Sequence, residues 1–224
     1  MKKFIIGLSP RFIHEENNDF IRVASAYNEA VKRENIVPLI IMDTPNLEDL
    51  LNLCDGFIII GGNDIDPIDY NESNDLNLSR GINKRMDEID KEIILHAKKH
   101  NKPMLGICRG IQAIAVYSGG SLHQDLNHAN ISHPMIDNTH HMVKKVNNYG
   151  VAKLLPDEFM VNTYHHQAVK QVPNDFLILY QNADTIEMIE STKQPILAVQ
   201  WHPEKIINDK YSRIIFDYFY RYFK

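Results

Sequence analysis

The residues best suited to covalent chemistry lie around Cys108, in the run Gly106-Ile107-Cys108-Arg109-Gly110. A short apolar run precedes this thiol and a stretch without helix breakers follows it, which predicts a buried strand, a sharp turn and a helix. Glycines at this spacing are typical of a nucleophile elbow, which holds the nucleophile exposed at the top of a sheet. A helix N-terminus lowers the pKa of a thiol, and its free N–H groups can bind an oxyanion. We therefore predict Cys108 as the nucleophile and the backbone N–H of Arg109 as one oxyanion donor, with a buried structural cysteine as the alternative.

A base for this thiol is offered by the stretch Val199-Gln200-Trp201-His202-Pro203-Glu204. A histidine at the end of a strand can face an elbow cysteine on a neighbouring strand. An acid two residues later can turn back toward the imidazole and orient it. The sequence thus predicts a catalytic triad of Cys108, His202 and Glu204.

The pair Gly61-Gly62 supplies a second oxyanion donor, because it follows the apolar run 57–60. In open α/β sheets ligands bind at the carboxyl ends of strands, and a glycine there brings a bare N–H close to the substrate. We predict that Gly62 is this donor. The acidic residues that follow lack the glycine and the terminal glutamate of a calcium loop, so they do not predict a cation site.

Histidine is abundant, with 11 residues in the chain. The pair His165-His166 is the rival site for the base, and we expect His166 to line the pocket instead. No spacing among the histidines matches a catalytic zinc signature such as H-E-x-x-H, so we expect no metal ion, and the chemistry requires no organic cofactor. The other histidines considered as metal ligands are His123, His128, His133, His140 and His141.

The elements that must position these residues alternate between strands and helices in the first half of the chain. Because the strands are apolar on both faces, we predict an α/β fold with a doubly wound, mostly parallel sheet flanked by helices. From about residue 132 onward, short runs separated by turn residues predict additional antiparallel strands. No linker or repeat interrupts residues 1–224, which we expect to form a single domain. The predicted strands are 4–8, 37–42, 57–60, the run before Cys108, 142–146, 176–180, 186–190 and 196–200, and the predicted helices are 17–33, 47–53, 84–100, 111–117 and 209–222.

The composition is that of a globular protein with a substantial core, since 44% of the 224 residues are hydrophobic and 24% are charged. The net charge is −5 and basic residues occur at most in pairs, so we expect no nucleic-acid partner. No apolar run approaches the length of a membrane span, and Pro10 and Arg11 interrupt the one nearest the N-terminus, so we expect a first strand rather than a signal peptide or an anchor. Cys54 is predicted to lie in the core. Two cysteines in such different settings indicate a reducing compartment, and we expect the cytoplasm.

These motifs together resemble the class I glutamine amidotransferase-like superfamily, whose fold is flavodoxin-like. Within it they resemble the gamma-glutamyl hydrolase-like branch, peptidase family C26, and most closely the gamma-glutamyl-gamma-aminobutyrate hydrolase type. The stretches that carry the resemblance are Gly61-Gly62-x-Asp64-x-x-Pro67-x-x-Tyr70, Pro103-x-Leu105-Gly106-Ile107-Cys108-Arg109-Gly110-x-Gln112, Gly119-Gly120-x-Leu122-x-Gln124-Asp125, His165-His166-Gln167 and Val199-Gln200-Trp201-His202-Pro203-Glu204. The departures from the pattern are Ala115, Asn71 and Asp184-Thr185.

The resemblance implies a role for each matching residue. Cys108 would attack the gamma-carbonyl of a glutamyl amide, His202 would move the proton and Glu204 would orient His202. The N–H groups of Gly62 and Arg109 would hold the oxyanion. The residues implied in substrate binding are Gly61, Gln112, Gln124 and His166.

The function implied is the hydrolysis of a small-molecule gamma-glutamyl amide through a glutamyl thioester, with gamma-glutamyl-gamma-aminobutyrate as the type of substrate. One alternative is a glutaminase subunit that delivers ammonia to a synthetase partner. A second is a binding module without catalysis. Acidic residues near the pocket would favour a cationic leaving amine such as a polyamine, and a homodimer is compatible with the sequence.

Overall fold

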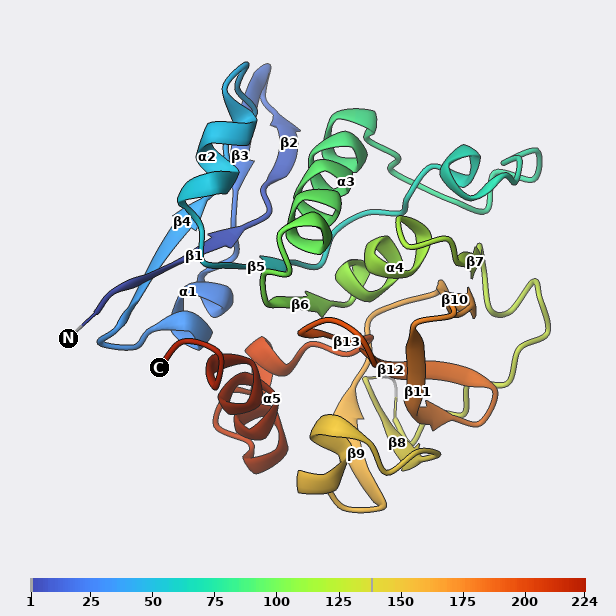
Figure 1. Cartoon of the computed structure of the whole chain (residues 1–224). Coiled ribbons are helices and arrows are strands. Elements are labelled where there is room, and N and C mark those ends of the chain that lie inside the picture. Colours follow the sequence, from blue (N-terminus) through green and yellow to red (C-terminus); the bar gives the residue numbers. More distant parts are fainter. Residues whose placement is uncertain (1, 138) are drawn as a thin grey trace.

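The computed structural model describes residues 2–137 and 139–224, which build a central sheet of nine strands (Figure 1). The first five strands in the spatial order run parallel and the other four are antiparallel. The prediction of a mostly parallel sheet with antiparallel strands in the C-terminal half is therefore confirmed. In spatial order the strands are β4 (Ile36–Ile40), β1 (Phe4–Leu8), β5 (Gly56–Ile59), β6 (Met104–Ile107), β13 (Ile196–Val199), β12 (Thr185–Ser191), β11 (Phe176–Asn182), β8 (His140–Lys145) and β9 (Glu158–Asn162).

Helices cover both faces of the sheet, as a doubly wound fold requires. Figure 1 shows α1 (Ser25–Val31) and α5 (Lys210–Tyr220) on one side, and α2 (Leu47–Leu53), α3 (Lys84–Lys99) and α4 (Arg109–Val116) on the other. Alternate residues of β5 and its extension enter the two cores: Ile58 and Ile60 face α5, whereas Phe57 and Ile59 face α3. Among the helices of the described residues, none has both the length and the apolar character needed to cross a membrane.

The predicted helix over residues 17–33 is wrong in its first half. Residues 18–22 form β3 (Asn18–Arg22), which pairs with β2 (Arg11–Glu15) in a hairpin beside the main sheet. The two turn residues, Glu16 and Asn17, have φ values of 46° and 65°. A two-residue hairpin turn of this kind needs positive φ at both positions, and asparagine tolerates it well. This turn chemistry outweighs the helical spacing of the apolar residues that follow.

Other predicted elements are present with ends that shift by up to two residues, and besides the hairpin strands β2 and β3, three further short strands are additional. They are β9 at the edge of the sheet and the pair β7 (Ser121–His123) and β10 (Ala168–Gln171), which forms a small sheet of its own. Three 3₁₀ helices complete the described elements: η1 (Pro67–Tyr70), η2 (Gly150–Leu154) and η3 (Pro203–Ile206). Cys54 is buried between the sheet and α2, and its Sγ lies 3.5 Å from the carbonyl oxygen of Leu50, so its prediction as a core residue is confirmed.

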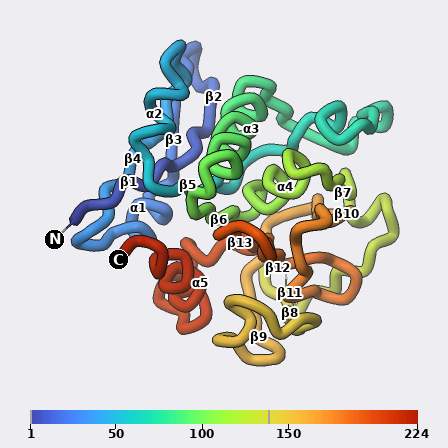
Figure 2. The backbone as a smooth tube through the Cα atoms, in the orientation of Figure 1, coloured from blue at the N-terminus to red at the C-terminus, as the bar shows by residue number. Residues whose placement is uncertain are grey.

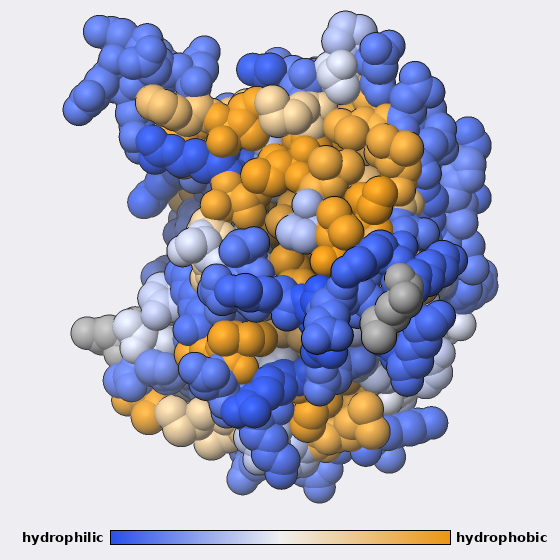
Figure 3. Space-filling view, turned by 90° about the vertical axis from the view of Figure 1, so that its left-hand side faces the viewer, coloured by the Kyte–Doolittle hydropathy of each residue, from blue (hydrophilic) through white to orange (hydrophobic). Residues whose placement is uncertain are grey.

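An apolar surface lies on the side of the molecule that carries the edge strand β4. Val37, Ile40 and Met42 are large hydrophobic residues exposed there. Figure 3, which views the molecule from this side, shows apolar side chains gathered over it. Figure 2 shows that both ends of the chain also lie on this side. The homodimer considered above stays a prediction.

Candidate active site

Cys108 lies between β6 and α4, at the turn where the sequence predicts an elbow. Its φ of 55° and ψ of −106° are strained for a residue with a side chain, which costs about 1 to 3 kcal/mol. A Cβ on Gly110 would collide with the carbonyl oxygen of Ile59, and a Cβ on Gly106 would lie 2.8 Å from the carbonyl carbon of Gly110. The two glycines therefore let β5, β6 and α4 approach closely enough to raise Cys108 at the carboxyl edge of the sheet.

His202 and Glu204 follow β13, the strand that pairs with β6. His202 Nδ1 lies 2.6 Å from Glu204 Oε1, and both side chains are buried. The backbone of His202 is held by Asn162, whose Oδ1 accepts from its N–H at 2.8 Å and whose Nδ2 donates to its carbonyl oxygen at 2.9 Å. This clamp at the end of β9 is a positioning group that sequence reasoning missed, although Asn162 begins the stretch that leads to His165-His166.

The imidazole of His202 also faces the thiol of Cys108. Burial lowers the pKa of His202, but hydrogen bonds with Cys108 and Glu204 outweigh burial and raise this pKa to about 9. A Cβ on Gly61 would lie 2.8 Å from Cε1 of His202, so the absence of a side chain there leaves room for the ring. At neutral pH the histidine is therefore charged, and it stabilises a neighbouring thiolate.

The two predicted oxyanion donors border the thiol. Arg109 is the first residue of α4, and Gly62 lines the same cavity as Cys108. Within residues 2–137 and 139–224, neither backbone N–H donates to another group. A Cβ on Gly62 would collide with Nε of Arg11, so a side chain here would displace Arg11 from the carbonyl oxygen of Gly61. Their role in oxyanion binding stays a prediction.

A buried cluster of charges holds this loop and the elbow together, and the sequence alone did not predict it. The side chain of Arg109 points away from the thiol and donates to Asp87 and Asp90 of α3. Arg11 of β2 lies 3.4 Å from Asp90 and donates to the carbonyl oxygen of Gly61 at 2.6 Å. Because a buried charge is stable only when it is paired and hydrogen-bonded, the four side chains fix one another and the Gly61-Gly62 backbone.

The cavity above Cys108 has a volume of about 340 Å³. Gln112 lines it, and its Nε2 donates to the carbonyl oxygen of Gln167 and to Oε1 of Gln200, both at 3.2 Å. Gln200 in turn places Nε2 at 3.8 Å from the sulfur of Cys108. The residues that line the cavity are Gly62, Asn63, Asp64, Arg80, Cys108, Gln112, Tyr164, His165, His166 and Gln167.

His166 lines this cavity, as the sequence predicts. Its Nε2 lies 3.0 Å from an oxygen of Asp64 and its Nδ1 lies 3.2 Å from an oxygen of Asp125. Hydrogen bonding to Asp64 is the main cause that raises the pKa of His166 above its usual value. The carboxylates on both sides of the ring thus favour its charged form at the cavity wall.

Two residues implied in substrate binding, Gly61 and Gln124, are not among those that line this cavity. Gln124 donates to Glu72 at 3.1 Å and lines a neighbouring cavity of about 310 Å³. The N–H of Gly61 donates to the hydroxyl of Tyr27 at 2.8 Å and is therefore occupied. Their contribution to substrate binding stays a prediction.

A cysteine on a strained turn at the carboxyl edge of a parallel sheet, beside a buried histidine and glutamate, is the arrangement expected of a class I glutamine amidotransferase-like protein. Comparison with protein families agrees with this class, because the model of peptidase C26 matches residues 5–204. The chain belongs to the peptidase C26 family.

Individual relatives cover most of the chain. The glutamine amidotransferase-like protein YvdE of Lactococcus lactis is 36% identical over 177 residues, which span 75% of this chain and 74% of that protein. The gamma-glutamyl-gamma-aminobutyrate hydrolase PuuD of Escherichia coli is 30% identical over 189 residues, which span 77% of this chain and 73% of that protein. A glutamine amidotransferase structure from Thermotoga maritima superposes with a TM-score of 0.60 at 14% identity and covers 99% of this chain and 92% of that one, so it shows a shared fold.

Proposed function

We propose that this protein hydrolyses the gamma-glutamyl amide bond of a small molecule through a glutamyl thioester. The observation that carries the proposal is the strained elbow of Cys108 beside the charged His202, which a buried Glu204 orients. No metal or organic cofactor is needed for this chemistry.

The proposed reaction has two steps. The Cys108 thiolate attacks the gamma-carbonyl carbon, and the oxyanion that forms is held by the N–H groups of Gly62 and Arg109. His202 gives its proton to the leaving nitrogen, the C–N bond breaks and the amine departs. His202 then takes a proton from water, which attacks the thioester carbon, and glutamate leaves as the Cys108 thiolate is regenerated.

The charges of the cavity favour an anionic leaving group. Arg80 lines the wall, and the neighbouring His166 is paired with the carboxylates of both Asp64 and Asp125. Asp64 already accepts from His166 and from the backbone N–H of Arg80 at 2.7 Å. A leaving amine that carries a carboxylate, such as gamma-aminobutyrate, therefore fits the wall better than a polyamine. The similarity to PuuD supports the same substrate.

The test is a panel of substrates with separate readouts for glutamate and for the amine. It contains glutamine, gamma-glutamyl-gamma-aminobutyrate and gamma-glutamyl-putrescine, with Cys108→Ala as the blank. We expect gamma-glutamyl-gamma-aminobutyrate to be hydrolysed well above the other two. Faster turnover of the putrescine amide would overturn the assignment of the leaving group and keep the hydrolase.

The glutaminase subunit is the second candidate, and the similarity to glutamine amidotransferase-like proteins favours it. It shares the same proposed catalytic residues, so only the substrate and the partner distinguish it. Activity confined to glutamine, or stimulated by a synthetase that purifies with the chain, would decide for this candidate.

We also propose that residues 1–224 act as one domain in a reducing compartment, for which we favour the cytoplasm. One nine-stranded sheet spans both halves of the chain. Cys54 and Cys108 are both free thiols, and the mechanism needs Cys108 reduced.

A further inference from the structure

A second buried glutamate, Glu187 of β12, lies among three histidines. The Nε2 atoms of His133, His141 and His165 lie 3.4, 3.3 and 3.5 Å from its carboxylate oxygens. These histidines come from three separate segments: the loop before β8, β8 itself and the loop between β9 and β10. We name Glu187 and these three histidines the Glu187 cluster.

The facing atoms of the Glu187 cluster have no satisfactory partner within the described residues. Both carboxylate oxygens of Glu187 and all three Nε2 atoms are buried without a well-formed hydrogen bond. A buried charge that lacks good hydrogen bonds is strongly unfavourable unless another charge compensates it.

The hydrogen on His165 can be assigned from its other nitrogen. Nδ1 lies 2.9 Å from the carbonyl oxygen of Gln167, which can only accept, so Nδ1 carries a hydrogen. A neutral His165 ring therefore aims the lone pair of Nε2 at the negative Glu187. This contact is repulsive unless a cation lies between the two atoms. A histidine that donates its other N–H to a backbone carbonyl is also the usual state of a metal ligand.

The separations fit a metal ion. In tetrahedral sites with bonds of about 2.0 to 2.1 Å, two ligand atoms lie about 3.3 to 3.4 Å apart. One atom each from His133, His165 and Glu187 lie within 4.8 Å of one another, and the distances from Glu187 are close to the tetrahedral value. Imidazole and carboxylate together are ligands typical of Zn²⁺ and its neighbours.

We propose that His133, His165 and Glu187 bind a divalent transition metal, for which Zn²⁺ is the best match. His141 faces the second carboxylate oxygen at 3.3 Å and would be a positioning residue for the ligand. These residues share no signature spacing, which is why no metal is expected from the sequence. None of the four belongs to the proposed triad, so this proposal is independent of the proposed function.

The site would link the metal to the wall of the Cys108 cavity. His165 lines that cavity and precedes His166. The carbonyl oxygen of Glu187 accepts from the N–H of Gln200 at 2.8 Å, and Gln200 reaches the sulfur of Cys108. A bound ion would therefore tie the loop of His133 and the cavity wall to β12.

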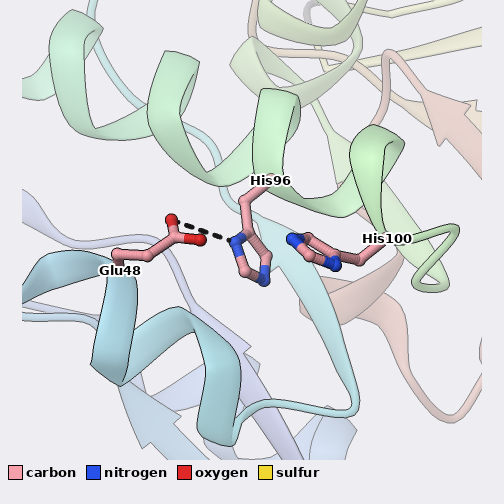
Figure 4. Close-up of side chains that lie close together, drawn as sticks. All are labelled: Glu48, His96 and His100. Atoms are coloured by element: carbon pink, nitrogen blue, oxygen red, sulfur yellow. Dashed lines mark hydrogen bonds and ion pairs between the residues drawn. The ribbon is translucent and has the colours of Figure 1, made fainter.

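A second group of potential ligands, Glu48, His96 and His100, provides a matched control (Figure 4). Glu48 and His100 are exposed, and His96 Nδ1 faces Glu48 at 3.3 Å. His96 is buried, but the side chains of Glu48 and His100 can move into water, so the group contains no buried carboxylate. We expect this surface group to bind zinc weakly.

The experiment uses the untagged full chain, stripped with EDTA, dialysed and titrated with ZnSO₄. We expect one tightly bound zinc per chain by calorimetry and elemental analysis, and a rise in Tm that EDTA reverses. When the stripped chain is loaded with Co²⁺ instead, we expect the visible absorption bands of a four-coordinate site. His133→Ala and His165→Ala should each lose the bound ion, whereas Glu48→Gln and His100→Ala should retain it.

The side chain of His133 is 12% exposed and that of His165 is 2% exposed. The His133 variant therefore keeps the test valid if changes at His165 prevent folding, which circular dichroism without metal will show. Absence of stoichiometric zinc and of any Tm shift in the parent chain would overturn the proposal in favour of a charged histidine paired with Glu187. Retention of zinc by His133→Ala with loss in His100→Ala would place the ion at the surface group and overturn it as well.

Discussion

Glu204 and Glu187 are both buried carboxylates next to histidine, but their surroundings differ. Glu204 faces one ring nitrogen at 2.6 Å, on a histidine whose backbone Asn162 holds from both sides. Glu187 faces three ring nitrogens at 3.3 to 3.5 Å, and none of them makes a well-formed hydrogen bond to it. Glu204 and His202 share a hydrogen bond, and the proton on the other side of the ring can move, which suits catalysis. The carboxylate oxygens of Glu187 lack hydrogen bonds and need a further positive charge, which suits a bound metal ion.

The largest contrast between the two groups should come from removing one histidine from each. We expect His202→Ala to lower kcat by about 10⁴-fold or more, because the thiolate loses both its partner and its proton donor. His141→Ala in the Glu187 cluster should lower kcat far less and should mainly reduce Tm in the presence of zinc. Steady-state kinetics and thermal unfolding of both variants check this, and equal losses of kcat would contradict the division of roles.

The next largest difference is expected when each glutamate is replaced by neutral glutamine. We expect Glu204→Gln to lower kcat by about 10² to 10⁴-fold with little change in KM, since the imidazole loses orientation and charge stabilisation. Glu187→Gln should abolish stoichiometric zinc binding. Kinetics and metal content measured on the same preparations test both effects, and retained zinc in Glu187→Gln would break the comparison.

The pH dependence tests the proton on His202. Its pKa in the folded protein is about 9, above the ordinary 6.5, because Cys108 and Glu204 favour the charged ring over the effect of burial. The resulting stabilisation is complete below about pH 6.5 and is lost as the pH rises through about 9. We expect kcat/KM to fall across the same basic limb, since the proton for the leaving amine is lost. In Glu204→Gln this limb should move to lower pH, and an unchanged limb would assign it to another group.

A smaller effect is expected from the clamp on the His202 backbone. Asn162→Ala removes two hydrogen bonds and leaves a buried N–H and a buried carbonyl without partners, which should lower the free energy of unfolding by about 1 to 3 kcal/mol. We expect kcat to fall on the order of 10-fold, because the ring is less well positioned. Chemical denaturation and kinetics measure the two effects. Asn162→Asp, which keeps an acceptor for the His202 N–H, should be intermediate in stability.

The smallest effect is expected at the surface group of Figure 4. His100 is exposed at the end of α3, so His100→Ala should change the free energy of unfolding by no more than about 0.5 kcal/mol. Activity should be unchanged. If His100→Ala clearly lost the rise in Tm that zinc causes, zinc would bind at the surface group and not at the Glu187 cluster.

The sequence was informative where function depends on local spacing. Gly106, Cys108 and Gly110 lie within one turn of chain, and the close approach of their backbones requires the glycines that make the motif visible. The apolar strands likewise predicted the parallel sheet, because β1, β5, β6 and β13 are buried on both faces. The hairpin of β2 and β3 was missed because its signal, two residues with positive φ at Glu16 and Asn17, is carried by turn chemistry rather than by apolar spacing.

Contacts between distant segments could not be predicted in the same way. In the Glu187 cluster, His133 contacts Glu187, although four strands separate the two residues in the sequence. The spacing of the three histidines of the cluster does not distinguish them from the other histidines of the chain. The hydrogen bond from Arg11 to the carbonyl oxygen of Gly61 could not be predicted either, because Arg11 lies in the hairpin of β2 and β3. The direction of the Gln124 side chain is set by Glu72 on another loop, which no local pattern reveals.

The different environments of the two thiols have a practical consequence for covalent labelling. Cys54 is packed between the sheet and α2, and burial raises its pKa to about 11, so a neutral solution contains little of its reactive thiolate. Cys108 opens onto a cavity and faces a charged imidazole. An electrophilic probe shaped like a glutamyl group should therefore modify a single position without any engineered cysteine, and the unmodified Cys54 would serve as the internal reference in a peptide map.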